Sequence, residues 1–289
     1  MDGLLIIDKP PGLTSADVVR VVKRHLRCKT GHLGTLDPFA TGVLPVCIGE
    51  GTKIAQFLAT ADKAYSGIAR LGQQTDSGDL TGTVIRSAPV PTISAQRLTA
   101  VAQSLLGELV QTPPMYSAVK QDGTPLYKLA RQGIAVERQP RRVHIAELQL
   151  VAHADTRLGF SLACSKGTYV RVLAEQIGIA LGTVAHLEAL RRTRFGHFGL
   201  DQAIALDELE RGAVRVIGLR EALAHLREIQ IDAATSHRAR QGYVPVLGGL
   251  GRGGRDEAAK LVGPMGELAA VIVSDASGRW RFGRVFAGS

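Results

Sequence analysis

The sequence has few cysteines, few aromatic residues and no long apolar run. Its three cysteines, Cys28, Cys47 and Cys164, are widely separated, with no Cys-x-x-Cys pair and no Cys/His cluster. A disulfide framework or a zinc site requires closely patterned ligands, so we expect three reduced cysteines that act as small apolar residues. No stretch approaches the ~20 apolar residues that a membrane-spanning helix requires.

The first residues do not resemble a secretion signal. The apolar run Leu4–Ile7 is flanked by Asp2 and Asp8, whereas a signal peptide has a basic n-region and a longer apolar core. We therefore expect a cytoplasmic protein with no membrane partner. The phosphate-binding pattern G-x-x-x-x-G-K-[ST] and the zinc-protease pattern H-E-x-x-H are also missing from the sequence.

A glycine-rich tract at residues 248–254 formally matches the dinucleotide-binding pattern G-x-G-x-x-G. That motif functions inside a βαβ unit with an acidic residue ~20 positions further on. Asp275 has about that spacing, but it lies in a Ser-Asp-Ala-Ser-Gly turn close to the C-terminus, where too few residues remain for a doubly wound domain. A flexible loop is therefore favoured over a nucleotide-dependent oxidoreductase.

The charge balance is basic. The chain has 35 Lys and Arg against 26 Asp and Glu, a formal net charge of +9. Such a surplus favours a polyanionic partner, because each cation that meets a phosphate releases a counterion. Residues 119–142 form either a solvated loop or an arm that grips a phosphate backbone. The basic residues in this arm are Lys120, Lys128, Arg131, Arg138, Arg141 and Arg142.

Hydrophobic patterning predicts an α+β fold with a mixed, largely antiparallel central sheet, flanking helices and a small β-rich C-terminal domain. We place the domain boundary between residues 229 and 230. Residues 28–51 are rich in Gly, Thr and Pro and are expected to form an ordered loop. Strands are expected at residues 3–8, 65–71, 143–150 and 158–164, and helices after Thr14, at 52–59, from Ser94 to Gly107, at 170–181 and twice within 207–226.

One acidic residue, Asp37, stands in a segment, residues 31–45, that is otherwise rich in Gly, Thr and apolar residues. A carboxylate in such surroundings is poorly solvated unless it finds a cationic partner. It is either a turn-capping residue before Pro38 or a nucleophilic or basic carboxylate shielded from water.

Residues 31–45 resemble the catalytic motif of the TruB family of tRNA pseudouridine synthases, in which the Asp of the Leu-Asp-Pro segment is essential. Segments similar to four further family motifs follow the expected order, at residues 3–15, 63–82, 164–178 and 186–196. The resemblance implies a pseudouridine synthase domain over residues 1–229 and a small PUA-like RNA-binding domain over 230–289. It also implies isomerisation of uridine 55 in the T loop of tRNA.

The resemblance also implies roles for individual residues. The target base must be flipped out of its stack into a closed pocket. Asp37 is then the catalytic carboxylate, and Arg171 orients it and keeps it ionised. Tyr65 offers a flat face for uracil and a hydroxyl that could relay the C5 proton. The expected substrate-binding residues are His32, Tyr169 and Leu190 around the pocket, with Lys128, Arg131, Arg141 and Arg142 on the arm.

Isomerisation of uridine needs no redox change, energy input or group donor, so we expect no cofactor and no metal. We also expect a monomer without an obligatory protein partner. Other hypotheses are a synthase that uses guide RNA and partner proteins, a non-catalytic RNA-binding or tRNA-folding protein, and the oxidoreductase of the glycine tract.

Overall fold

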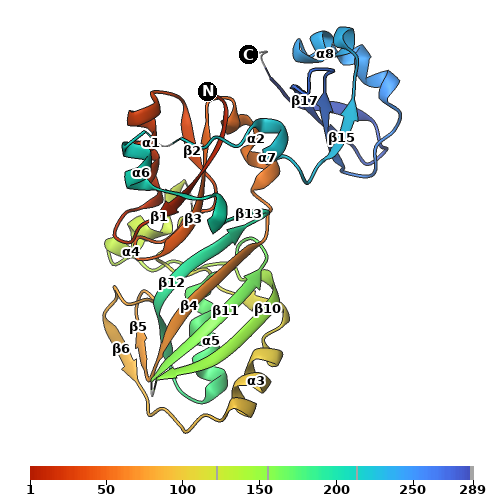
Figure 1. Cartoon of the computed structure of the whole chain (residues 1–289). Coiled ribbons are helices and arrows are strands. Elements are labelled where there is room, and N and C mark those ends of the chain that lie inside the picture. The colour runs from red at the N-terminus through yellow and green to blue at the C-terminus, as the bar shows by residue number, and fades with distance from the viewer. Residues whose placement is uncertain (122, 155, 213, 287–289) are drawn as a thin grey trace.

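The computed structural model describes residues 1–286 except residues 122, 155 and 213. One large twisted sheet runs through most of the molecule, and a smaller sheet lies to one side of its upper end in Figure 1. The protein is therefore built on two main sheets.

The large sheet has ten strands, and its main path runs β14-β1-β3-β12-β4-β11-β10-β7. The β1–β14 and β3–β12 pairs are parallel and the other pairs are antiparallel. This confirms the predicted mixed, largely antiparallel sheet. Its strands are β1 (Gly3–Lys9), β2 (Thr30–His32), β3 (Thr41–Ile48), β4 (Lys63–Leu71), β7 (Gly107–Gln111), β10 (Arg141–Ala154), β11 (Arg157–Cys164), β12 (Ala185–Phe195), β13 (Phe198–Gly199) and β14 (Ile204–Ala205). Two small hairpins join β5 (Gln73–Thr75) to β6 (Val84–Ser87) and β8 (Lys120–Gln121) to β9 (Thr124–Pro125).

Helices flank this sheet, and their starts follow local sequence signals. The Thr14 hydroxyl accepts from the Asp17 amide (3.1 Å), and the Asp17 carboxylate accepts from the Thr14 amide (2.8 Å), which forms a capping box at the start of the helix expected after Thr14. The helices are α1 (Ser15–Leu26), α2 (Gly51–Leu58), α3 (Ala95–Ser104), α4 (Leu126–Arg131), α5 (Val170–Leu181), α6 (Leu206–Glu210), α7 (Leu219–Ala222) and the 3₁₀ turn η1 (Leu200–Gln202).

The expectation that residues 28–51 form a loop is wrong for much of that segment, because β2 and β3 lie within it. β3 is central: β1 pairs with it on one side and β12 on the other. Its residues from Gly42 to Ile48 are buried. A Cβ atom at Gly42 would lie 2.2 Å from the Arg192 carbonyl, so this glycine permits close strand approach and does not mark a loop.

β12 joins the two ends of the large sheet. It pairs with β4 along most of its length and with β3 near Arg191 and Arg192. Helix α5 packs against one face of β12, with Leu173 and Ile177 buried in the main core. Figure 1 shows α5 behind the strands, so the side chains on β12 alternate between the α5 side and the opposite side.

The smaller sheet contains β15 (Arg227–Gln230), β16 (Ala258–Val262), β17 (Leu268–Ser274) and β18 (Trp280–Val285). β17 and β18 form an antiparallel hairpin within the β-rich part expected at the end of the chain. Helix α8 (Ala233–Arg240) was not expected, because its apolar face is short. The glycine tract lies in the turn η2 (Val244–Leu250) and the loop that follows it. The tract precedes the antiparallel pair β16–β17 rather than opening a βαβ helix, so the nucleotide interpretation is wrong.

The two sheets share an apolar contact. Leu268, Val271 and Phe286 belong to the same core cluster as Ile54 and Leu58 of α2. The small sheet begins at residue 227, close to the predicted boundary. The division into residues 1–229 and 230–289, and the PUA-like character of the second part, stay predictions. Across the described ranges, no helix combines the length and apolar character needed to cross a membrane.

Candidate active site

Asp37 lies in the loop of residues 33–40, which joins β2 to β3 and is anchored to neighbouring backbone. The Ser15 hydroxyl accepts from the Leu36 amide (2.9 Å) and donates to the Leu36 carbonyl (3.2 Å). Within the loop, the Ala40 amide donates to the Asp37 carbonyl (3.1 Å). These contacts fix the backbone of the loop at Asp37 independently of the partners of its carboxylate.

Lys9 supports the same loop. Its fully buried ammonium donates to the carbonyls of Ala40 (2.7 Å), Pro10 (2.8 Å) and Pro38 (3.1 Å). Burial lowers the pKa of Lys9 to about 8, and the nearby Asp37 carboxylate opposes that change. Lys9 therefore positions the loop through backbone contacts.

Arg171 binds the Asp37 carboxylate with both arms of its guanidinium. Nε lies 3.0 Å from Oδ2, and Nη2 donates to Oδ1 at 3.1 Å. Arg171 is in the first turn of α5, and 5% of its side chain is exposed, against 33% for Asp37. The carboxylate therefore faces accessible space while its partner is held behind it, as expected for a bidentate pair that fixes orientation.

The Arg171 guanidinium is itself fully engaged. It donates to the carbonyls of Tyr116 (2.7 Å) and Ser77 (2.9 Å), and its Nη1 lies 3.6 Å from Oδ2 of Asp79. The buried Asp79 carboxylate accepts from the Thr81 hydroxyl (2.6 Å). The sequence analysis did not identify Asp79. This residue lies within the motif segment 63–82, but its polar neighbours there are also typical of a surface turn.

The groups around Asp37 shift the pKa of its carboxyl group in opposite directions. Burial raises the pKa of its carboxyl, Arg171 and Lys9 lower it, and the Asp79 carboxylate raises it further. The net direction is upward, so Arg171 does not by itself keep the group as acidic as an exposed aspartate. A carboxylate with a raised pKa is a better proton acceptor than an exposed one, which suits a nucleophile or a base.

A cavity of about 570 Å³ opens beside Asp37, within the ~300–1,000 Å³ typical of small-ligand sites. The structure brings most of the expected site residues into its wall. These are Asp37, Tyr65, Arg141, Arg142, Tyr169, Arg171 and Leu190. Their elements are far apart in sequence, and the pairing of β4 with β12 places Tyr65 and Leu190 in one wall. Acidic, aromatic, apolar and basic groups thus surround one space.

His32 ends β2 near the motif but does not line this cavity. Burial, followed by the charge of Arg192, lowers the pKa of its imidazole. Its Nδ1 atom is buried without a hydrogen-bond partner among the described residues. The neutral ring is therefore placed to orient the motif, and contact with substrate stays a prediction.

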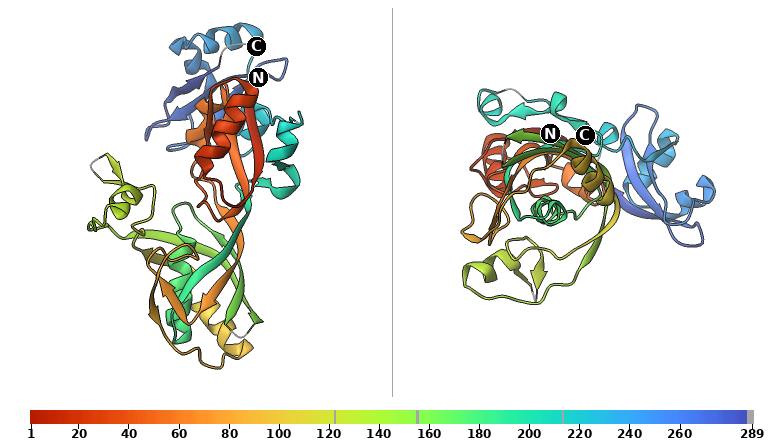
Figure 2. Two further views of the ribbon diagram at one scale, coloured as in Figure 1. Left: turned by 90° about the vertical axis from the view of Figure 1, so that its left-hand side faces the viewer. Right: turned by 90° about the horizontal axis from the view of Figure 1, so that it is seen from below.

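The arm, residues 119–142, is described apart from residue 122, and it stands out from the body on the α5 side of the sheet (Figure 2). Lys128 and Arg131 lie on α4 and are exposed, with Arg131 5.7 Å from the ring of Tyr127. Neither residue lines the cavity, whereas Arg141 and Arg142 at the end of the arm do, together with Ser117 and Ala118 just before it. Lys128 and Arg131 are thus separated from the cavity that contains the carboxylate.

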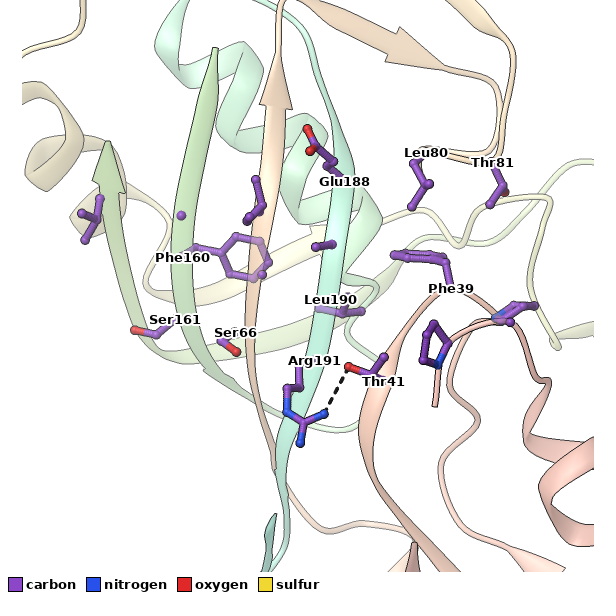
Figure 3. A pocket seen from close by; sticks show the side chains of 18 of the residues that line it. Phe39, Thr41, Ser66, Leu80, Thr81, Phe160, Ser161, Glu188, Leu190 and Arg191 are labelled. Carbon is purple, nitrogen blue, oxygen red and sulfur yellow. Dashed lines mark hydrogen bonds between the residues drawn. The ribbon is translucent and has the colours of Figure 1, made fainter. Parts of the chain in front are cut away.

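A second groove, of about 830 Å³, lies on the opposite face of the sheet. Figure 3 shows Phe39, Phe160 and Leu190 lining it, with helix α5 behind the strands. Its charged side chains are already paired: Arg191 with Asp8 at 2.7 Å, and Glu188 with Arg157. The groove does not contain Asp37, Tyr65 or Arg171, so it is not the candidate catalytic centre.

Two family models cover most of the chain, and both describe pseudouridine synthases, which are isomerases. The model "TruB family pseudouridylate synthase (N terminal domain)" matches residues 21–170, and "tRNA pseudouridylate synthase B C-terminal domain" matches residues 171–228. The chain belongs to the TruB family of pseudouridylate synthases. The resemblance inferred from five motifs is confirmed, and the oxidoreductase and the non-catalytic RNA-binding or tRNA-folding protein are excluded as its class.

Individual relatives agree with this assignment. The chain is 49% identical over 213 residues to tRNA pseudouridine synthase B of Bordetella avium, covering 73% of this chain and 87% of that protein. It is 43% identical over 257 residues to the protein of the same name from Coxiella burnetii (strain Dugway 5J108-111), covering 86% and 83%.

Among solved structures, an H/ACA RNP bound to a substrate RNA containing 2′-deoxyuridine matches with a TM-score of 0.73 at 23% identity, covering 99% of this chain and 85% of that chain. A Cbf5-Nop10-Gar1 complex matches with a TM-score of 0.72 at 24% identity, covering 99% and 84%. These likenesses support the α+β fold with its separate C-terminal sheet.

Proposed function

We propose that this enzyme isomerises uridine 55 in the T loop of tRNA, with Asp37 as the catalytic carboxylate. The names of its relatives support tRNA as the substrate. The observation that carries the proposal is the bidentate ion pair between Asp37 and Arg171. It lies in the wall of a cavity that is also lined by Tyr65, Tyr169 and Leu190. In the reaction the C1′–N1 bond breaks, the base turns, C1′ bonds to C5, and the C5 proton is replaced by a proton at N1.

The cavity walls suit a flipped nucleoside. Leaving the stack costs the RNA a few kcal/mol, which contacts in the cavity must offset. Tyr65 supplies a flat ring for the uracil, Leu190 an apolar wall, and Tyr169 a surface beneath the sugar. Asp37 attacks the sugar at C1′ and displaces the base, or adds to the uracil ring, or removes a sugar proton, while Arg171 keeps the carboxylate aimed at the substrate. The Tyr65 hydroxyl relays the proton that leaves C5.

The remaining RNA contacts are assigned to basic surfaces. The arm supplies Lys128, Arg131, Arg141 and Arg142 to phosphates of the T stem-loop, and the C-terminal sheet holds the RNA from a second side. Phosphate contacts supply affinity, while the shape of the loop and its splayed bases supply recognition. The protein acts as a cytoplasmic monomer in this proposal.

The decisive experiment incubates the purified chain with an unmodified tRNA transcript and maps pseudouridine at single-nucleotide resolution. No cofactor, guide RNA or partner protein is added. Pseudouridine at position 55 alone supports the proposal, and a transcript with cytidine at that position is the matched control. Modification elsewhere, or only after a guide RNA and partner proteins are supplied, would reject it in favour of a synthase with another RNA target.

A further inference from the structure

Arg192 is a buried cation behind the candidate active site that the proposed mechanism does not use. It is 1% exposed and is among the largest fully buried side chains of the described part of the protein. On β12 it lies directly opposite Tyr65 of β4, and both side chains contribute to the wall of the cavity that holds Asp37. The sheet register therefore pairs this arginine with the tyrosine that is expected to stack on the target base.

The guanidinium of Arg192 is only partly satisfied. Its Nε donates to the Val43 carbonyl at 2.7 Å, and its charge lies 5.4 Å from the centre of the Phe195 ring. Its Nη2 has no hydrogen-bond partner among the residues that the structure describes. Buried polar atoms are normally bonded, and an unpaired one indicates strain, function or a missing partner.

The catalytic motif leaves room for this arginine. Gly34 has a φ of 60°, and a Cβ atom there would lie 2.8 Å from the Phe195 ring and 3.2 Å from Nη1 of Arg192. A side chain at this position would therefore press on both the ring and the guanidinium. The motif loop thus packs directly against the group that faces Tyr65.

The charges around Arg192 are mostly of its own sign. Its charge lowers the pKa values of Lys9, Lys63 and His32, after the larger effect of burial on each. No carboxylate oxygen of the described chain forms an ion pair with it. An unpaired buried charge is strongly unfavourable, so simple stabilisation of the fold does not explain why an arginine stands at this position. The ionisable group that acts favourably on Arg192 is the Tyr65 hydroxyl.

We propose that Arg192 is a positioning residue for Tyr65: its guanidinium orients the phenol and stabilises negative charge on the phenol oxygen during proton transfer. Arg192 does not touch the substrate in this proposal. The proposal rests on the proposed function, in which the Tyr65 hydroxyl takes part in the reaction.

The titration behaviour of Tyr65 agrees with this geometry. Burial raises the pKa of its phenol, and the charge of Arg192 opposes that rise. Cys164 and Asp37 add to the rise, so Arg192 is the facing group that favours the phenolate. Loss of the arginine charge should therefore raise the pKa of Tyr65 further, whereas a purely mechanical role would leave it unchanged.

The pairing is tested by ¹³C NMR of tyrosine ring carbons in the intact protein. The chain has five tyrosines, so Tyr65→Phe assigns the relevant signal. Arg192→Gln should raise the pKa of Tyr65 further, and Arg192→Lys should raise it less because a positive charge remains. The matched control is Arg191→Gln on the same strand, whose partner is Asp8 on the other face of the sheet. It should leave the signal unchanged.

Turnover gives the second readout. Arg192→Gln should reduce single-turnover isomerisation at least about tenfold, with RNA affinity within a few-fold of the parent and partial rescue in Arg192→Lys. In a Tyr65→Phe background the same change should have little further effect, because the hydroxyl it acts on is gone. If Arg192→Gln does not fold, as judged by circular dichroism, the comparison uses Arg192→Lys.

The two proposals fail in different ways. Full activity of Tyr65→Phe would remove the hydroxyl from the reaction and reject that part of the proposed function, whatever Arg192 does. An unchanged pKa of Tyr65 in the folded Arg192 variants would overturn the present inference, even if Tyr65 proved essential. Equal losses from Arg192→Gln in the parent protein and in the Tyr65→Phe background would also overturn it.

Discussion

Asp37 and Asp79 contact the same guanidinium. Arg171 holds Asp37 through two contacts of 3.0 and 3.1 Å and lies 3.6 Å from Asp79 on its other side. One buried cation is therefore shared by an accessible carboxylate and a buried one. The buried carboxylate raises the pKa of the accessible one, which links a residue outside the cavity to the reactivity of Asp37.

Asp79→Asn should shift the acidic limb of the pH–rate profile to lower pH. The negative charge of Asp79 raises the pKa of Asp37, so removing it lowers that pKa and leaves Asp37 ionised in more acidic solution. The amide can still accept the hydrogen bond from Thr81, so the turn is preserved. The measurement is kcat/KM for an unmodified transcript across pH. A limb that stays in place or moves to higher pH would contradict the coupling.

Asp37→Asn should abolish isomerisation while tRNA binding stays nearly intact, because the amide keeps the shape but loses the charge and the nucleophilicity. The structure adds a prediction about stability. The pKa of Asp37 is raised in the folded protein, so ionisation of this carboxyl lowers the free energy of unfolding. The loss is complete at a pH above the pKa of Asp37 in the folded protein, and it disappears at a pH below its pKa in the unfolded protein.

The neutral variant should therefore melt at the same temperature as the parent or higher at neutral pH, and the difference should vanish in acid. Calorimetry at two pH values measures this, alongside a filter-binding assay. A clear fall in Tm would mean that the ion pair with Arg171 stabilises the fold more than burial of the carboxylate destabilises it. Trace activity must be checked in protein from a host that lacks its own enzyme.

Arg171→Lys should reduce turnover on the order of 100-fold, since misplacement of a reactive group by about 1 Å has effects of that size. An ammonium keeps the charge but cannot bind two carboxylate oxygens while donating to the carbonyls of Ser77 and Tyr116. Single-turnover rates separate this loss from binding. Arg191→Lys, on the opposite sheet face, is the matched control. A crystal structure with RNA in which Arg171 and Asp37 are apart would refute their pairing.

Replacing the four arm cations, Lys128, Arg131, Arg141 and Arg142, by Ala should weaken binding of every tRNA about equally. It should also flatten the dependence of log Kd on log salt by roughly 0.7–0.9 per lost phosphate contact. The choice of uridine should not change, because that choice belongs to the cavity. The double variant Arg70→Ala/Arg157→Ala, on the sheet face away from α5, is the control. If a different uridine were modified, the arm would have a role in placing the RNA so that the correct uridine enters the cavity.

Several features could be predicted because they depend on neighbouring residues. The capping box at Thr14 and the helix from Val170 to Leu181 follow from signals that act within one or two turns. β3 could not be recognised in the same way, since its Gly and Pro residues suggest a turn when its partners are unknown. In the folded chain β1, β2 and β12 supply its hydrogen bonds, and that pairing overrides local preference.

The sequence alone determined that Asp37 is an isolated acid in a segment where a carboxylate needs a cation, and its motifs identified the family. The tertiary structure decided which cations and acids surround it. Arg171 is 134 positions away along the chain, and Asp79 joins the pair only because the β5–β6 turn lies against α5. Likewise, the register of β4 against β12 puts Arg192 opposite Tyr65. Such contacts depend on strand register over the whole sheet, whereas sequence patterns report burial and turns within a few residues.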